Sequence, residues 1–386
     1  MKILWIAQKD LSQDLDSATW IEMAKALNKR DHQIMLITLL KSSQEFRNSC
    51  SKIIIKELSV VNRFPFVALT FHLQVIFICL FWLFSTKPDA VITHPITSIF
   101  LLPSVVMAKI FRLNTKFILD IRTLPISSLG VTGNIKKALN SISIQIGKMC
   151  FDGITVITPT LKRLISERFC IDQKKIGIWM SGVDPHQFCP KQISIKRVQK
   201  LKNSFVVMYH GVLVKNRGLF ELIEAMSLVQ ERNLNILLFI MGKGTAYNEL
   251  IDLVHQLKLE QAVIFHEPVS HQEIPVYIAQ TDVGILPLPD IWCWRVSSPL
   301  KLFEYLAMEK LVIVSAIEAH TFVLNNCPAS IFLKSTMPVD IADGIIKAYY
   351  LQNHLSDLGK AGRKMVMKKF TWDHQATELE SYIHKL

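Results

Sequence analysis

The sequence predicts an α/β protein made of two doubly wound parallel-sheet domains, each with helices on both faces of its sheet. The length of 386 residues suits two domains. Short apolar runs alternate with helical patterns along the whole chain, and this alternation starts again after Pro190. Strands that alternate with helices favour parallel sheets covered on both faces.

The composition favours a cytoplasmic protein with an anionic partner. The net charge of +12 suits a phosphate substrate, an acidic lipid surface or a nucleic acid. We expect no nucleic-acid partner, because the sequence has no recognisable DNA-binding helix or aromatic-studded basic strands. The seven cysteines are scattered without a Cys-x-x-Cys pair, which favours reduced thiols. Residues 2–7 resemble a core strand and lack the features of a signal peptide.

In the first half, apolar runs mark strands and helical periodicity marks helices. Asp16 or Ser17 suits the cap of the first helix, and Pro159 suits the first turn of another. The expected strands are residues 2–7, 33–38, 52–58, 89–93, 116–120 and 154–157. The expected helices are residues 20–27, 98–112, 133–149 and 158–169.

After a polar and basic stretch at residues 193–203, the alternation resumes. The expected strands are residues 204–210, 235–241, 262–266, 282–286, 311–315 and 331–333. The expected helices are residues 219–230, 246–257 and 299–308, with residues 339–386 helical throughout. Doubly wound domains bind ligands at the carboxyl ends of their strands, so the site is expected there.

Residues 64–84, bounded by Phe64 and Phe84, are almost wholly apolar. About 20 apolar residues suffice to span a bilayer. A span would split one α/β domain across the membrane. We therefore expect a helix packed in or on the first domain, with one face available for peripheral contact with the inner membrane.

The most informative segment begins with Ser297 and Ser298. Ser298 suits a helix cap and Pro299 the first helical position. The N-terminus of a helix can hold a diphosphate. Lys301 and Glu304 share a helix face, so a cation near the phosphates would precede a carboxylate that accepts hydrogen bonds from ribose hydroxyls. The alternative is a capped surface helix with an ordinary Lys–Glu pair.

Two glycine turns follow strands at the same expected sheet edge. Gly211 permits close backbone approach, and Lys215 and Arg217 offer charge for phosphate binding. Gly242 and Gly244 form the second turn. The alternatives are a basic strand–helix turn and an ordinary tight turn.

In this order, the motifs resemble those of family 4 of the retaining GT-B glycosyltransferases (glycosyl transferases group 1). The resemblance covers nearly the whole chain. It is carried by Asp152-Gly-Ile-Thr, Ser181-Gly-Val-Asp184, Phe188-Cys-Pro190, Arg217-Gly218, Met241-Gly-Lys-Gly244, Ser297 to Ala307, and Phe370-Thr-Trp372.

The resemblance implies two Rossmann-like domains with the active site in the cleft between them. It implies an acceptor-side domain at residues 1–190, a nucleotide-sugar-binding domain at 191–370, and a helix at 371–386 that packs back on the first domain. The catalytic residues would be Arg217 and Lys301 at the donor diphosphate and Glu304 at the ribose. The donor-binding residues would be Gly211, Lys215, Gly242, Gly244, Ser297 and Ser298.

The sequence also departs from the family pattern. Val296 stands where the first glutamate of a paired-glutamate motif is usual, so recognition of the donor sugar must differ. Trp292, Trp294 and Arg295 are candidates to compensate. Other departures are Thr123, Ser181, Val212 and the replacement of a glycine-rich loop by residues 8–16.

The resemblance implies that a sugar moves from a nucleoside-diphosphate sugar to a glycan or lipid-linked acceptor in surface-polysaccharide assembly. Front-face attack with retention would need no metal or cofactor. The alternatives are a nucleotide-sugar epimerase of the same fold and a catalytically weak sugar-nucleotide-binding homologue. The candidate acceptor contacts are Asp16, His94, Asp120 and Arg122, although Asp120 and Arg122 also suit a structural ion pair.

Overall fold

The computed structural model describes residues 1–8, 17–39, 53–58, 66–124, 131–193, 201 and 203–386. The chain forms two compact units, one of Met1–Met180 with Trp372–Leu386 and the other of Ser181–Thr371. The sequence boundary at residue 190 therefore differs from the division after Met180. The reason is that Ser181 and Val183 already bond within the second unit, where the Val183 N–H donates to the Phe370 carbonyl at 2.9 Å.

The first unit is built on a seven-stranded parallel sheet with the order β3-β2-β1-β4-β5-β6-β7. Its strands are β1 (Lys2–Ile6), β2 (Gln33–Leu39), β3 (Ile54–Leu58), β4 (Ala90–Thr93), β5 (Lys116–Ile121), β6 (Gly153–Val156) and β7 (Ile176–Ile178). All apolar residues of strands β1, β4 and β6 are buried, because both faces of a parallel sheet are covered. These strands therefore appear in the sequence as continuous apolar runs. The sequence predicted the first six strands, and β7 is an addition.

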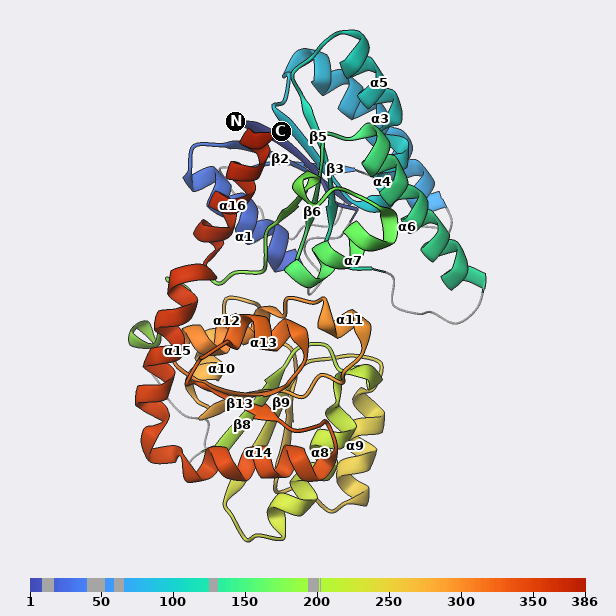
Figure 1. Ribbon diagram of the computed structural model, residues 1–386. Helices are drawn as coiled ribbons and strands as arrows, with labels where there is room; N and C mark the ends of the chain where they lie inside the picture. The colour runs from blue at the N-terminus through green and yellow to red at the C-terminus, as the bar shows by residue number, and fades with distance from the viewer. Residues whose placement is uncertain (9–16, 40–52, 59–65, 125–130, 194–200, 202) are drawn as a thin grey trace. The chain divides into compact units, whose positions relative to one another are not determined.

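Helices cover both faces of this sheet (Figure 1). On one face, α1 (Ser17–Lys29) packs against α16 (Trp372–Lys385). On the other lie α3 (Phe66–Ser85), α4 (Pro95–Phe100), α5 (Leu102–Ile110) and α6 (Val131–Cys150). The helix expected at residues 98–112 is thus two helices, because Pro103 in the first turn of α5 cannot donate the hydrogen bond that a continuous helix requires. Helix α7 (Pro159–Phe169) begins as predicted, with Thr158 as its cap.

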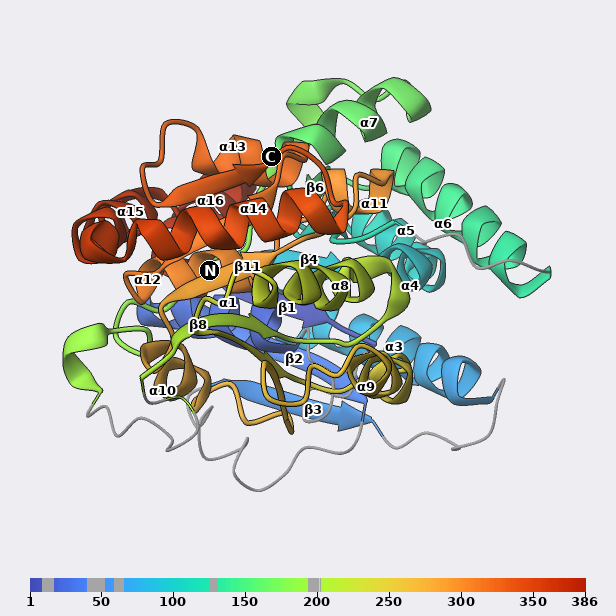
Figure 2. The same cartoon turned by 90° about the horizontal axis from the view of Figure 1, so that it is seen from below.

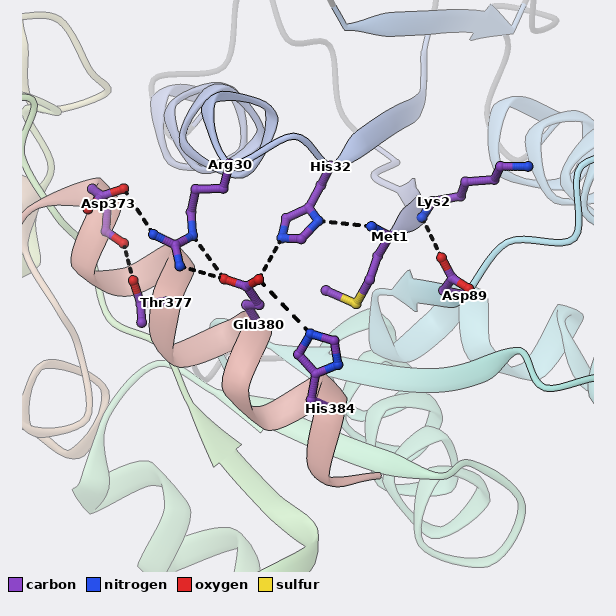
Figure 3. A network of polar contacts seen from close by, with 9 residues as sticks. All are labelled: Met1, Lys2, Arg30, His32, Asp89, Asp373, Thr377, Glu380 and His384. Carbon is purple, nitrogen blue, oxygen red and sulfur yellow. Dashed lines mark hydrogen bonds and ion pairs between the residues drawn. The ribbon is translucent and has the colours of Figure 1, made fainter.

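A polar network attaches α16 to the rest of the first unit (Figure 3). Both Nε and Nη2 of Arg30 donate to Glu380 Oε2, at 2.9 and 2.7 Å. Glu380 Oε1 lies 3.2 Å from His32 Nε2. Trp372 and Leu379 on the same helix are buried. The C-terminal helix is therefore an integral part of the first unit.

The second unit is built on a six-stranded parallel sheet with the order β10-β9-β8-β11-β12-β13. Its strands are β8 (Phe205–His210), β9 (Ile236–Met241), β10 (Val263–His266), β11 (Val283–Leu286), β12 (Leu311–Ser315) and β13 (Ser330–Leu333). All six were predicted. Side chains such as Val207, Leu238 and Ile313 form a continuous core with the covering helices.

Helix α14 (Pro338–Tyr350) lies beside α8 (Leu219–Gln230), which also contacts α9 (Tyr247–Gln256) (Figure 2). Helix α12 (Leu300–Ala307) packs on β11 and β12, with α15 (Leu355–Lys369) against it. The tail at residues 339–386, expected to be helical throughout, is divided among α14, α15 and α16. The remaining helices of this unit are α10 (Ile274–Ala279), α11 (Trp292–Arg295) and α13 (Glu318–Leu324).

Candidate functional site

Two glycine turns meet at the carboxyl ends of β8 and β9. Gly211 has a φ of 128°, and a Cβ added to it would lie 2.7 Å from Lys301 Nζ. Gly242 has a φ of 154°, and its Cβ would collide with the Gly211 carbonyl. Gly244 likewise approaches the Leu213 carbonyl. Side chains at these positions would force the turns apart, so glycine keeps the two turns close to each other and the Gly211 backbone close to the Lys301 amine.

Lys301 is a buried cation beside these turns. It is 9% exposed, and its Nζ lies 4.0 Å from the centre of the Tyr209 ring. Among the described residues, this amine has no hydrogen-bond partner. Burial, reinforced by the nearby charge of Arg217, holds the pKa of Lys301 well below its ordinary value. A buried amine without partners is costly, and an anionic ligand would offset that cost.

Arg217 is the second cation at this place. It ends the short 3₁₀ helix η4 (Lys215–Arg217), and its guanidinium carbon lies 4.9 Å from the centre of the Trp294 ring. Its buried Nε has no hydrogen-bond partner in the described part of the chain. The Trp294 indole also donates to the Asn216 carbonyl at 2.7 Å. Trp294 therefore supports the loop that carries Arg217.

Lys215 points elsewhere. Its side chain is 69% exposed, and its amine pairs with Glu249 on α9 at 2.6 Å. Arg295, a candidate to compensate for the missing glutamate, pairs with Asp290 at the surface. The structure therefore brings together Arg217 and Lys301, but neither Lys215 nor Arg295 joins them.

The carboxylate of Glu304 is buried between two histidines. His271 Nε2 lies 2.8 Å from Oε1, and His210 Nε2 lies 3.3 Å from Oε2 without the geometry of a hydrogen bond. Burial lowers the pKa of His210 to about 4, so this imidazole is neutral near pH 7. Burial alone would raise the pKa of Glu304. The hydrogen bond from His271 and the charges around the carboxylate outweigh it and lower that pKa.

His271 links Glu304 to Gln187. The Gln187 amide nitrogen donates to the His271 carbonyl at 2.7 Å and lies 3.3 Å from His271 Nδ1. The sequence analysis did not include His271 or Gln187 in the site. No local spacing could have revealed them, since 33 and 84 positions separate the partners of these contacts.

The start of α12 corrects the expected cap. The helix begins at Leu300 with Pro299 in the cap position, and the side chain of Pro299 makes no capping hydrogen bond. The Ser298 hydroxyl instead accepts from the Ser181 N–H at 3.1 Å, and the Ser298 carbonyl accepts from the Ser181 hydroxyl at 2.7 Å. Ser298 thus binds the segment at the start of the second unit. Ser297 donates to the Trp294 carbonyl at 2.8 Å, and Val296 is buried.

Asp120 and Arg122 are buried in the first unit around Trp179. Asp120 Oδ1 accepts from the Thr155 hydroxyl at 2.8 Å and from the Trp179 indole at 3.1 Å. The guanidinium of Arg122 lies 3.4 Å from the centre of the Trp179 ring and donates to its carbonyl. Burial raises the pKa of Asp120 and lowers that of Arg122 to about 10. These contacts make both side chains part of the unit's core.

Of the other two candidate acceptor contacts, the structure describes His94, which lies at the carboxyl end of a strand of the first sheet. His94 follows β4, and its ring centre lies 5.5 Å from that of Trp20. Asp16 lies outside the described residues. Within the described part of the chain, no group of three or more His, Cys, Asp or Glu side chains is arranged to hold a metal ion.

Two family models match successive parts of the chain. The model for glycosyl transferases group 1 matches residues 190–365, which hold the Lys301 and Glu304 site. The model for glycosyltransferase family 4 matches residues 17–187. The chain belongs to the GT-B glycosyltransferases of group 1.

Similar proteins agree with this family. The uncharacterized glycosyltransferase MJ1059 of Methanocaldococcus jannaschii is 32% identical over 46% of this chain and 45% of its own. CapM of Staphylococcus aureus, a capsular polysaccharide biosynthesis glycosyltransferase, is 24% identical over 61% of this chain and 62% of its own. The chain thus spans only part of each relative's length.

The fold itself matches along the whole chain. The crystal structure of Anabaena Alr3699/HepE in complex with UDP-glucose has a TM-score of 0.77 and 14% identity, and the match covers 100% of both chains. This likeness and the two parallel sheets establish the GT-B fold that the sequence predicted.

Proposed function

We propose that the protein transfers a sugar from a nucleoside-diphosphate sugar to a glycan or lipid-linked acceptor, with retention at the anomeric carbon. The observation that carries this proposal is the buried Lys301 amine, which lacks a partner among the described residues and shares its surroundings with Arg217. A diphosphate would supply the missing acceptors. The complex of Alr3699/HepE with UDP-glucose supports a donor of this class.

In this proposal each charged group has a separate task. Arg217, Lys301 and the N–H groups at the start of α12 stabilise the negative charge that develops on the leaving diphosphate. Glu304, ionised because its pKa is lowered, accepts hydrogen bonds from the ribose hydroxyls. The departing phosphate acts as the base for the acceptor hydroxyl, so the scheme uses no protein nucleophile, metal or cofactor.

The acceptor and the location complete the proposal. We place the acceptor on the first unit, with His94 and the guanidinium of Arg122 as candidate contacts. Nε and Nη2 of Arg122 have no hydrogen-bond partner among the residues that the structure describes. CapM is a capsular polysaccharide biosynthesis glycosyltransferase, which supports a role in surface-polysaccharide assembly. We further place the protein at the cytoplasmic face of the membrane. Val296 is buried at the position where the family usually has a glutamate. Because this glutamate is missing, the second candidate function is that of a catalytically weak homologue that binds sugar nucleotides.

Thermal-shift measurements with UDP-, GDP- and ADP-sugars test donor binding, because a ligand that binds only the native state raises its stability. We expect one class to raise the melting temperature and Arg217→Ala and Glu304→Ala to abolish the rise. Lys215→Ala is the matched control and should retain it, since Lys215 pairs at the surface. An undiminished rise in both site variants would refute this placement.

Product analysis separates the candidate functions. A transferase releases the nucleoside diphosphate and glycosylates a lipid-linked acceptor from a membrane extract. An epimerase converts the donor into an isomeric sugar nucleotide without any acceptor. A binding protein gives the thermal shift but neither product.

A further inference from the structure

Helix α3 carries a row of exposed apolar side chains. Leu69, Leu73, Phe77 and Phe81 are spaced four residues apart, which places them along one side of the helix. Phe77 and Phe81 are 71% and 67% exposed. On the opposite side, a second row is buried in the first unit and consists of Phe71, Val75, Cys79 and Leu83. The helix therefore lacks the polar outer face that a water-exposed helix normally has.

Helix α5 extends this apolar area. It packs beside α3, and the rings of Phe84 and Phe111 meet edge to face with their centres 5.2 Å apart. Val106, Ile110 and Phe111 are each more than half exposed. We call the whole area the α3–α5 surface: Leu69, Leu73, Phe77, Phe81, Phe84, Val106, Ile110 and Phe111. Apolar patches of this kind mark interaction sites.

The charge around the α3–α5 surface is positive. Lys109 and Arg112 are exposed and flank Ile110 and Phe111 directly in the sequence. From residue 66 to 150 the acidic residues are Asp89 and Asp120, and Asp120 is buried. The basic residues of the same stretch are Lys87, Lys109, Arg112, Lys116, Arg122, Lys136, Lys137 and Lys148, and of these Arg122 is buried.

Helix α3 is nevertheless fixed in the first unit. Among the described helices, it alone is long and apolar enough to cross a membrane. However, β3 before it and β4 after it belong to the same parallel sheet, so both ends of the helix lie on one side of any membrane. The buried His72 also bonds to Thr97 at 3.3 Å and stacks on Phe100 at 4.2 Å. Crossing a bilayer would break these contacts.

We propose that the α3–α5 surface binds the surface of an anionic lipid membrane. The apolar side chains enter the boundary between headgroups and acyl chains, and Lys109 and Arg112 contact anionic headgroups. A second copy of the chain suits the area less well, because two such surfaces would bring their basic residues together. This inference goes beyond the sugar transfer and holds whether or not the protein has that activity.

Flotation of the full chain with lipid vesicles tests the proposal. We expect binding to vesicles that contain about 30% phosphatidylglycerol, and much weaker binding to pure phosphatidylcholine, because the basic residues need anionic lipid. The double substitution Phe77→Glu and Phe81→Glu should weaken binding by about tenfold or more, since it removes two apolar anchors and adds negative charge. Lys109→Glu with Arg112→Glu should reduce the preference for anionic vesicles.

The matched control is Met337→Glu with Val339→Glu, two exposed apolar residues of the second unit. These substitutions should leave vesicle binding unchanged. Circular dichroism and melting temperature check that each variant is folded. The proposal would be overturned if the Phe77 and Phe81 variant bound vesicles as well as the wild type. It would also be overturned if the wild type did not bind vesicles but self-associated in solution, and the variant did not self-associate. The thermal shift caused by the sugar donor is measured without vesicles, so it tests the proposed function independently of membrane binding.

Discussion

His271 Nε2 lies 2.8 Å from Glu304 Oε1, and this contact sets the orientation of the carboxylate. An ionised carboxylate only accepts hydrogen bonds, so Nε2 carries the hydrogen. The His271 carbonyl also only accepts hydrogen bonds, so the group of Gln187 that faces it must be the amide nitrogen. The same nitrogen lies near His271 Nδ1 and presents an N–H toward it. Gln187 thus favours the tautomer in which His271 donates to Glu304.

Removal of His271 should weaken donor binding. His271→Ala leaves the Glu304 carboxylate without its shortest hydrogen bond, and bonds to charged groups are worth about 1.5–3 kcal/mol. We expect the donor dissociation constant to rise roughly tenfold in isothermal titration calorimetry. His271→Gln, which can donate to the same oxygen, should recover part of the affinity. His255→Ala, at an exposed histidine–glutamate pair, serves as the control. Equal affinities in all four proteins would argue against the positioning role.

Replacement of Lys301 should separate stability from binding. Lys301→Met keeps the length of the buried side chain and removes a cation that lacks a partner among the described residues. We expect the free energy of unfolding without ligand to stay equal or rise by about 1 kcal/mol, while the donor-induced thermal shift disappears. Urea unfolding and thermal-shift measurements check the two effects. A variant that loses stability but keeps the shift would contradict the anion site.

Acid should destabilise the fold through two buried histidines. Burial lowers the pKa values of His210 and His320 to about 4, below the ordinary value of 6.5. Between these values the unfolded chain binds protons that the native protein does not, so stability falls as the pH decreases from 6.5 toward 4. Urea unfolding at several pH values measures this loss. His320→Asn should reduce the slope of stability against pH, and an unchanged slope in this variant would contradict the prediction.

The Arg30–Glu380 pair should contribute modestly to the attachment of α16. The hydrogen bond from Arg30 lowers the pKa of Glu380. The stabilisation is therefore present above the unfolded pKa of the carboxyl and is lost as the pH falls through the lowered folded value. Because the pair is partly exposed, we expect Glu380→Gln to cost roughly 1 kcal/mol at pH 7. Glu378→Gln, in a weaker and more exposed contact with His374, should cost much less by urea unfolding.

Local patterns in the sequence were sufficient for the glycine turns and for all described strands except the short edge strand β7. Buried strands leave apolar runs, and Gly211 and Gly242 occur where side chains would collide. The hydrogen-bond partners of Ser298 and Glu304 could not be predicted, because they come from segments far away in the sequence. Ser298 meets Ser181 across 117 positions, so a serine that suits a helix cap by its sequence neighbours is used differently in the fold. The division after Met180 depends on the same contact.

The depressed pKa of Lys301 has a thermodynamic consequence for ligand binding. A phosphate placed against the amine favours its charged form and restores its basicity, so any neutral fraction takes up a proton on association. The heat of binding then varies with the ionisation enthalpy of the buffer. Affinity for an anionic ligand also declines in alkaline solution, and the proton taken up by the Lys301 amine provides a measure of ligand binding.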